Sequence, residues 1–282
     1  MHSRTHSADG QDSVSAQISY LVPMKDKPTT YVCDPPAGKP ALNATYEWQP
    51  AVVRNARPLR ARLSLEHEGF LLADHTSATS NFWDDSLVRS VYFPEVEELV
   101  RSLTGAREAL VFDHTRRRRT GRGPLNGNQL TFSDVREPVG KAHADFTARS
   151  AVARLKLEVG ARAAELQAGR FAIINVWRPL NRAPILDAPL AVLDAGSMHA
   201  EDLVASDLIY SDRIGETYNL TYSPTHRWHY FPEQNRNEAI VFKNFDSQST
   251  APFAPHTAFD DPHAPPDAPL RESIEARVFA FF

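Results

Sequence analysis

Apolar residues have helical spacing in parts of the first half of the chain and strand-like spacing in the second half. The stretch Thr147–Ala168 is the clearest helix, because Thr147 can cap its start and Gly169 can end it. Its apolar residues fall on one helical face: Val152, Leu155, Val159 and Leu166. Upstream, two shorter helices are predicted between Asp84 and Gly105, with Pro94 in a first-turn position.

From Arg170 onward, short β-type segments recur with turns between them and without alternating helices. These segments are Phe171–Trp177, Leu190–Leu193, Thr217–Tyr222, Trp228–Phe231, Ala239–Phe245, Thr257–Phe259 and Ile274–Phe282. Ala16–Val22 and Ala109–His114 are earlier strand candidates, and Arg116–Arg119 leads into a predicted loop. Many short strands after a helical part favour a mainly β sandwich or barrel with flanking helices.

Composition narrows the class of protein. The length of 282 residues suits one large domain, with Met1–Ser13 as a disordered tail, and the net charge of −4 does not favour nucleic acid or anionic lipid as a partner. The single cysteine, Cys33, excludes an internal disulfide and a thiolate metal cluster. The sequence lacks a long apolar run and a secretory signal, so the expected location is cytoplasmic without membrane contact. Composition does not indicate an oligomeric state.

The sharpest local motif is His143-Ala-Asp145. Residues two apart in a strand project to the same face, so this imidazole and carboxylate would enter one cavity together. With a further histidine they would form the 2-His-1-carboxylate face of a non-haem iron site, which leaves positions open for co-substrate and dioxygen. A hydrogen-bonded histidine at a strand edge is the alternative interpretation of this motif.

Four later histidines are candidates for the third ligand: His226, His229, His256 and His263. His256 has apolar flanks that suit a buried strand near the C-terminus, so we expect it to be the ligand. His226 and His229 flank Trp228 and are better interpreted as residues of a substrate pocket or of the core. Further on, Arg271 and Ser273 would share one face of the last strand, where a guanidinium and a hydroxyl can hold a carboxylate. A surface ion pair of Arg271 with Glu272 or Glu275 is the alternative.

The order of these motifs resembles that of the double-stranded β-helix oxygenases, with H-x-D early, then a β-rich stretch, a histidine and Arg-x-Ser. Several blocks also resemble the AsaB-like hydroxylase/desaturase family, which includes gibberellin desaturase-like proteins and a cephem methoxylase component. The blocks are VFDHTRRR, HADFT, NVWRPL, PLAVLDAGS, HRWHYFPEQNRNEAIVFKNFDS and HTAFDDP with RESIEARVFAFF. The resemblance implies a double-stranded β-helix (jelly-roll or cupin-like) core, roughly residues 109–282 of a single oxygenase domain, 1–282.

The same resemblance implies iron(II), 2-oxoglutarate as co-substrate and dioxygen, with a small molecule as the partner. By position, His143, Asp145 and His256 match the iron ligands, and Arg271 and Ser273 match the keto-acid anchor. The expected reaction is hydroxylation, desaturation or ring formation on a small secondary metabolite. Two alternatives stay open at this point: an iron oxidase that uses no 2-oxoglutarate, and a non-catalytic β-barrel accessory or binding protein.

Four further residues are predicted to line the site on less specific grounds. Asn175 could hydrogen-bond the co-substrate, or form a turn, and Arg178 could pair with a substrate carboxylate. Arg116 could fold over an anionic substrate, although runs of arginine are usually solvated, and Trp228 could line the substrate pocket or the core.

Overall fold

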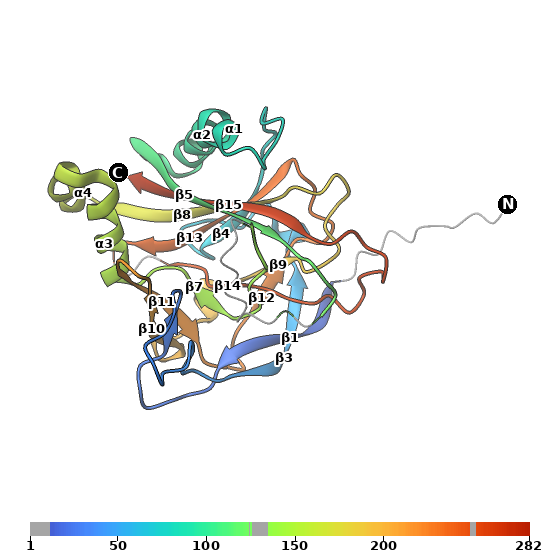
Figure 1. Ribbon diagram of the computed structural model, residues 1–282. Coiled ribbons are helices and arrows are strands. Elements are labelled where there is room, and N and C mark those ends of the chain that lie inside the picture. Colours follow the sequence, from blue (N-terminus) through green and yellow to red (C-terminus); the bar gives the residue numbers. More distant parts are fainter. Residues whose placement is uncertain (1–11, 124, 126–134, 249–251) are drawn as a thin grey trace.

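Two β-sheets face one another and enclose the interior of the molecule (Figure 1). The computed structural model describes residues 12–123, 125, 135–248 and 252–282. Within these residues, one sheet has nine strands, in the spatial order β1 (Ser13–Leu21), β3 (Tyr46–Asn55), β12 (Trp228–Tyr230), β9 (Leu190–Leu193), β14 (His256–Ala258), β7 (His143–Ala144), β11 (Ile214–Leu220), β10 (Leu203–Ile209) and β2 (Thr29–Tyr31). The other sheet has six, in the order β4 (Phe70–Asp74), β13 (Glu238–Asp246), β8 (Phe171–Pro179), β15 (Glu272–Phe281), β5 (Glu108–Arg118) and β6 (Val135–Arg136). The mainly β architecture with a jelly-roll core is therefore as predicted.

The helices lie against the six-stranded sheet (Figure 1). The elements are α1 (Asp85–Leu87), a π-helical turn (Val88–Tyr92), α2 (Phe93–Thr104), α3 (Ala148–Val159) and α4 (Ala163–Ala168), with 3-10 turns at Arg57–Leu59, Gly160–Arg162, Ala195–Ser197 and Ala200–Asp202. Thr147 caps α3 as predicted, and Gly105 ends α2 in the left-handed conformation. The predicted helix Thr147–Ala168 is broken at Gly160. Its φ is 55°, and glycine adopts a positive φ more easily than other residues do because it has no Cβ atom.

The two faces of β8 have different neighbours, and this division decides which side chains reach the interior. Val176 packs beneath α2 together with Val96, on the outer face of the sheet. Trp177 points the other way and packs with Leu190 of the opposite sheet. Because both faces are covered, every residue of β8 is buried and its sequence shows no hydrophobic alternation.

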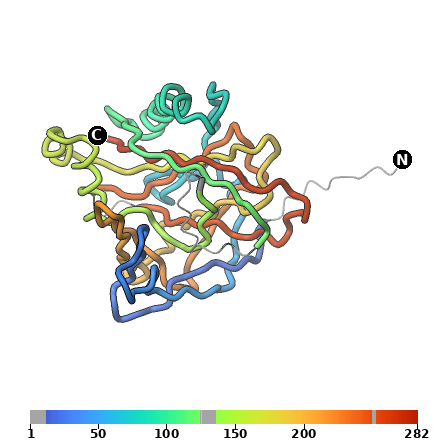
Figure 2. Tube along the Cα trace, viewed as in Figure 1, coloured from blue at the N-terminus to red at the C-terminus, as the bar shows by residue number. Residues whose placement is uncertain are grey.

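The N-terminal strands β1 and β3 form an antiparallel pair that extends the nine-stranded sheet (Figure 2). Ser19 of β1 also bridges to Lys141, just before β7, so β1 contacts the sheet at two separate places. The buried residues Ile18 and Tyr20 of β1 pack against Trp228. The strand candidate Ala16–Val22 thus corresponds to β1, which begins three residues earlier.

Several boundaries differ from the predictions. Ser13 already belongs to β1, and the rest of the proposed tail, except residue 12, lies outside the described residues. Both sheets include strands from before residue 109, so the sheets are more extensive than the predicted core. Strand β5 continues through Arg118, beyond the predicted strand Ala109–His114, because Arg116 and Arg117 pair with β15. Strands β2, β3, β6 and β10 were not predicted.

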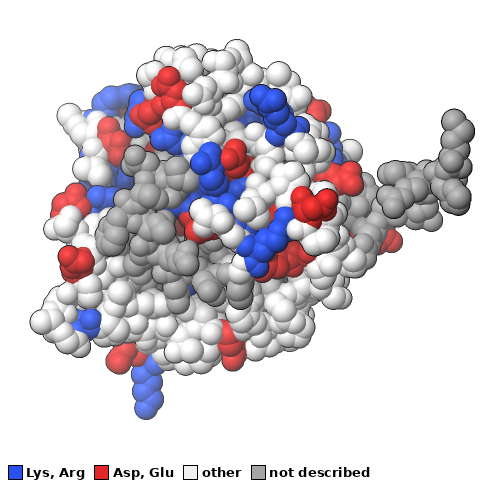
Figure 3. Space-filling view, turned by 45° about the vertical axis from the view of Figure 1, so that its right-hand side comes forward, with Lys and Arg blue, Asp and Glu red and all other residues white. Residues whose placement is uncertain are grey.

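Basic and acidic side chains are intermixed on the face shown in Figure 3. Among the described residues, the helices are too short or too polar to cross a membrane.

Candidate metal centre

His143 and Asp145 are positioned by β7 and by the residue that follows it. His143 pairs with Asn219 of β11 on one side and with His256 of β14 on the other. Asp145 lies just past the end of β7, where its backbone N–H donates to the side-chain oxygen of Asn244 at 2.8 Å. The register of β13 against β8 shifts around Asn244, and such a bulge re-aims a side chain. The bulge therefore supplies an anchor for the backbone of Asp145.

His256 is placed opposite His143 by the antiparallel pairing of β14 with β7, and their ring centroids lie 4.4 Å apart. Its ring packs against Phe242 of the other sheet, with 4.7 Å between ring centroids. Its Nδ1 atom has no hydrogen-bond partner among the described residues, so packing fixes this ring. Burial and the nearby His143 lower the pKa of His256 well below its usual value, so the ring is neutral and can donate a lone pair.

Three ligand-type atoms converge between these residues. One ligand atom each from His143, Asp145 and His256 lies within 4.8 Å of the other two. Nε2 of His143 is 3.4 Å and Nε2 of His256 is 4.0 Å from Oδ1 of Asp145. Nδ1 of His143 donates to the carbonyl of Lys141 at 2.8 Å, a tautomer that leaves the Nε2 lone pair free. The donor set and its orientation fit a 2-His-1-carboxylate metal site.

The second oxygen of Asp145 is held from outside this triad. Oδ2 accepts from Nδ2 of Asn175 at 2.8 Å and from Nε of Arg277 at 2.9 Å, which leaves Oδ1 facing the two imidazoles. Burial alone would raise the pKa of Asp145, but the charged guanidinium of Arg277 outweighs burial and holds the pKa well below the usual range. Asn175, which we predicted to bind the co-substrate, thus contacts the carboxylate of Asp145.

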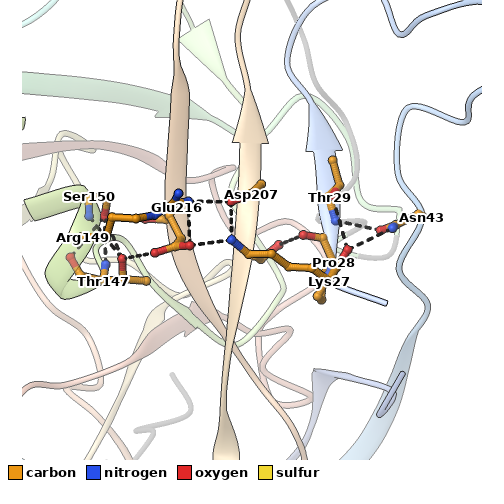
Figure 4. Close-up of polar contacts among 10 residues, drawn as sticks. Lys27, Pro28, Thr29, Asn43, Thr147, Arg149, Ser150, Asp207 and Glu216 are labelled. Atoms are coloured by element: carbon orange, nitrogen blue, oxygen red, sulfur yellow. Dashed lines mark hydrogen bonds and ion pairs between the residues drawn. The ribbon is translucent and has the colours of Figure 1, made fainter. Parts of the chain in front are cut away.

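An ion-pair cluster holds the start of α3, two residues beyond Asp145 (Figure 4). The carboxylate of Glu216 accepts from Oγ1 of Thr147, the N-cap residue, and pairs with Lys27 at 2.6 Å and with Arg149 at 2.7 Å. Asp207 of β10 pairs with the same two cations, at 2.6 Å and 2.9 Å. Burial would raise the pKa of Glu216, but these partners lower it to about 2. The cluster therefore joins the N-terminal segment to the helix that follows the metal motif.

A small cavity lies between the two histidines and Arg271. Its lining residues are Arg117, Val139, His143, Trp177, Leu190, His256, Ala258, Arg271 and Glu275. The guanidinium of Arg271 is buried and stacks over Trp177 at 5.0 Å from the ring centroid. Its Nε donates to Oγ of Ser273 at 3.2 Å and its Nη1 to the carbonyl of Ala188 at 2.7 Å. Nη2 has no hydrogen-bond partner among the described residues, so it is available to a ligand.

Three charged residues at the site were not predicted. Arg117 and Glu275 line the cavity, and Arg277 holds Asp145. Burial lowers the pKa of Arg117 to about 10 and that of Arg271 to about 9. Burial also raises the pKa of Glu275. The signal was present in the sequence, because Glu275 and Arg277 continue the two-residue alternation that begins with Arg271 and Ser273.

The less specific candidates lie on other faces. Arg116 is next to Arg117 but points outward, where Nη1 donates to the carbonyl of Trp83 at 2.9 Å. Arg178 lies on the outer face of β8 and donates to the carbonyls of His75 and Arg236. Nε1 of Trp228 donates to Oη of Tyr20 at 2.7 Å in the core that β1 covers. These contacts separate all three residues from the cavity.

The other three candidate histidines have partners away from the triad. His226 is 3.1 Å from the carboxylate of Asp202, and His229 packs against Phe70 with 5.8 Å between ring centroids. His263 lies 3.4 Å from Asp261 at the surface. His256 is thus the histidine, of the four candidates, that joins His143 and Asp145.

Comparison with known proteins gives consistent matches over nearly the whole chain. A family model described as an oxidoreductase/YMDC permease-like domain matches residues 18–281. The Fe(II)/2-oxoglutarate-dependent dioxygenase nvfI of Aspergillus novofumigatus is 32% identical over 249 residues, which are 84% of this chain and 86% of the relative. The hydroxylase/desaturase efuI of Hormonema carpetanum is 31% identical over 256 residues, 84% of this chain and 85% of the relative. The solved structure of the iron and alpha-ketoglutarate-dependent endoperoxidase NvfI matches with a TM-score of 0.85 and 27% identity, over 96% of this chain and 98% of that one.

Proposed function

Because this chain belongs to the oxidoreductase/YMDC permease-like domain family and is an Fe(II)- and 2-oxoglutarate-dependent dioxygenase, we propose that His143, Asp145 and His256 bind its iron. The observation that carries this proposal is the convergence of three ligand atoms within 4.8 Å. The other polar atoms of His143 and Asp145 are already engaged, so Nε2 and Oδ1 are the atoms left for a metal. An accidental cluster of surface acids and histidines would lack this arrangement of supporting hydrogen bonds.

Arg271 and Ser273 bind the distal carboxylate of 2-oxoglutarate in this proposal. The cavity lies between Arg271 and the triad, and in this proposal the dicarboxylate spans it. A buried guanidinium with a free Nη2 costs free energy unless an anion neutralises it, and a carboxylate satisfies both its charge and its geometry. Arg117 adds a second cation to the cavity wall. Bound iron and 2-oxoglutarate supply dioxygen activation, coupled to oxidation of the keto acid to succinate and carbon dioxide.

The protein's own groups orient the ligands and exclude water. Arg277 and Asn175 fix one oxygen of Asp145, so the carboxylate does not have to reorganise when a cation arrives. Trp177 and Leu190 give the cavity apolar walls beside the charged groups, which strengthens each electrostatic contact there. The substrate is a small molecule, and the outcome is hydroxylation, desaturation or ring formation.

Succinate release tests the proposal. Purified protein with Fe(II), 2-oxoglutarate and dioxygen should form succinate, slowly without substrate and faster with a small molecule that fits. Asp145→Ala should form none, whereas Arg116→Gln, on the outer face of the six-stranded sheet, should behave as the wild type. Product formation without succinate would instead indicate an oxidase, and equal succinate formation by Asp145→Ala would exclude the assigned ligand set.

A further inference from the structure

Arg277 bridges two buried carboxylates at the metal centre. Its Nε donates to Oδ2 of Asp145 at 2.9 Å, and its Nη2 donates to Oε1 of Glu275 at 2.7 Å. Its remaining nitrogen, Nη1, donates to Oγ1 of Thr115 at 2.9 Å. A planar guanidinium with three engaged nitrogens holds both carboxylates in fixed orientations. Each carboxylate therefore has one bound oxygen and one oxygen turned away from Arg277.

The oxygens turned away from Arg277 approach the same imidazole nitrogen. Nε2 of His256 lies 4.0 Å from Oδ1 of Asp145 and 3.9 Å from Oε2 of Glu275. Glu275 is not part of the tight triad, and it borders the cavity on the path from His256 to Arg271. Its side chain is only 6% exposed, so water contributes little to its solvation. A buried carboxylate is costly unless both of its oxygens have partners. Arg277 satisfies Oε1 of Glu275, so Oε2 requires a second partner on the cavity side.

We propose that Glu275 is a second carboxylate ligand, which binds the divalent metal while the keto acid is absent and leaves it when the keto acid enters. The inference rests on the proposed metal site. A facial triad leaves open positions on the cation, and hard divalent cations accept carboxylate oxygens readily. Oε2 of Glu275 is oriented toward the nitrogen that the cation uses, much as Oδ1 of Asp145 is. Glu275 thus offsets the charge of the cation and occupies one of its open positions until the keto acid binds.

Entry of the keto acid displaces Glu275 from the metal because it brings two further negative charges into the cavity. A dianion brings its own oxygens to the metal and pairs with Arg271 and Arg117, which line the same cavity. Like charges in one low-dielectric site repel, so Glu275 and the incoming carboxylates cannot share it at low cost. Glu275 keeps its bond to Nη2 of Arg277 and swings only its free oxygen away. No bond to carbon is made or broken in this exchange.

The test is titration of Glu275→Gln with Co(II) as the probe metal, in the absence and presence of 2-oxoglutarate. Glu272→Gln is the matched control, since Glu272 is on the same strand and pairs at the surface with Arg118. Without keto acid, Glu275→Gln should raise the Kd for Co(II) about tenfold or more, because it removes a ligand. With saturating keto acid the difference should vanish. By linkage, the Kd of the Co(II)-loaded variant for 2-oxoglutarate should fall by the same factor.

Two results would overturn the inference. One is an unchanged Co(II) affinity of Glu275→Gln without keto acid. The other is a loss that persists in full when keto acid is present, which would indicate a purely structural role. Failure of the wild type to bind Co(II) at all would instead refute the proposed metal site, so the two failures are distinguishable.

A measurement on the wild type covers the case in which Glu275→Gln does not fold. Infrared difference spectra of protein labelled with ¹³C-glutamate should show a shifted carboxylate band when Co(II) binds, and 2-oxoglutarate should reverse the shift. Absence of a glutamate band that responds to the metal would refute the inference.

Discussion

His143 and His256 are directly paired across the neighbouring antiparallel strands β7 and β14, and their rings lie 4.4 Å apart between centroids. The chain separates the two residues by more than a hundred positions, yet one cross-strand pair brings their Nε2 atoms to the same carboxylate. Cross-strand pairing fixes side chains more firmly than loops do, and this suits a site that has to exist before the metal arrives.

Arg277→Gln should weaken metal binding although Arg277 is not a proposed ligand. The substitution removes the donor to Oδ2 of Asp145 and leaves Asn175 as the remaining side-chain donor to that oxygen. Loss of such supporting contacts typically raises the Kd for the metal about 10-fold to 100-fold. Co(II) titration measures the change, with Arg118→Gln on β5 as the control. An unchanged Kd would show that Arg277 does not position Asp145.

Arg271→Ala should weaken binding of 2-oxoglutarate without a comparable loss of metal affinity. Removal of one partner from a desolvated charge pair costs about 2–5 kcal/mol, or roughly 30-fold or more in Kd. Titration of the Co(II)-loaded protein with 2-oxoglutarate measures this change in Kd. If the Kd for the keto acid stayed within twofold of the wild type, the anchor would have to lie elsewhere in the cavity.

Arg117→Gln and Arg116→Gln test which arginine of the basic run faces the cavity. Arg117 lines it and pairs in register with Ser273, whereas Arg116 contacts the carbonyl of Trp83 on the opposite face. We expect Arg117→Gln to raise the Kd for 2-oxoglutarate by about tenfold and Arg116→Gln to leave it unchanged. The reverse pattern would mean that the register of β5 is shifted by one residue.

Glu216→Gln should destabilise the protein in a pH-dependent way. The folded-state pKa of Glu216 is about 2, below its ordinary value of 4.5, so its contribution to stability is present above pH 4.5 and is lost as pH falls toward 2. At neutral pH the variant should lose about 1–2 kcal/mol, a low value because Lys27 and Arg149 are partly solvated.

Urea unfolding at a series of pH values measures this difference for Glu216→Gln, with the exposed Glu201→Gln as the control. The gap between wild type and Glu216→Gln should narrow as the solution is acidified below pH 4.5. A gap that stayed constant down to pH 2 would show that the ionised carboxylate is not the source of the stabilisation.

The sequence allowed prediction of the elements whose signals are local. The two-residue repeat of a β-strand predicted that His143 and Asp145 lie on one face. Apolar flanking residues distinguished His256 from the other candidate histidines. The prediction was weakest where the answer depends on what lies across the sheet. Alternation alone states that Arg116 and Arg117 face opposite ways, but it does not state which of them faces inward, because register depends on β15.

Other omissions have the same physical origin. Trp228 and His229 are neighbours on β12, and the tryptophan faces the core under β1 while the histidine faces the interior. The N-terminal pair β1 and β3 covers Trp228 through contacts that are remote in sequence, and no local pattern reports them. Glu275 and Arg277 were within reach of prediction, since they extend the polar alternation of Arg271 and Ser273.

The most direct test of the central claim is an anaerobic Fe(II) titration of the wild type and of Asp145→Ala, with circular dichroism to confirm that both are folded. We expect the wild type to bind a single Fe(II) per chain and the folded Asp145→Ala protein to bind none under the same conditions. Stoichiometric iron binding by folded Asp145→Ala would contradict the assignment of His143, Asp145 and His256 as the metal centre.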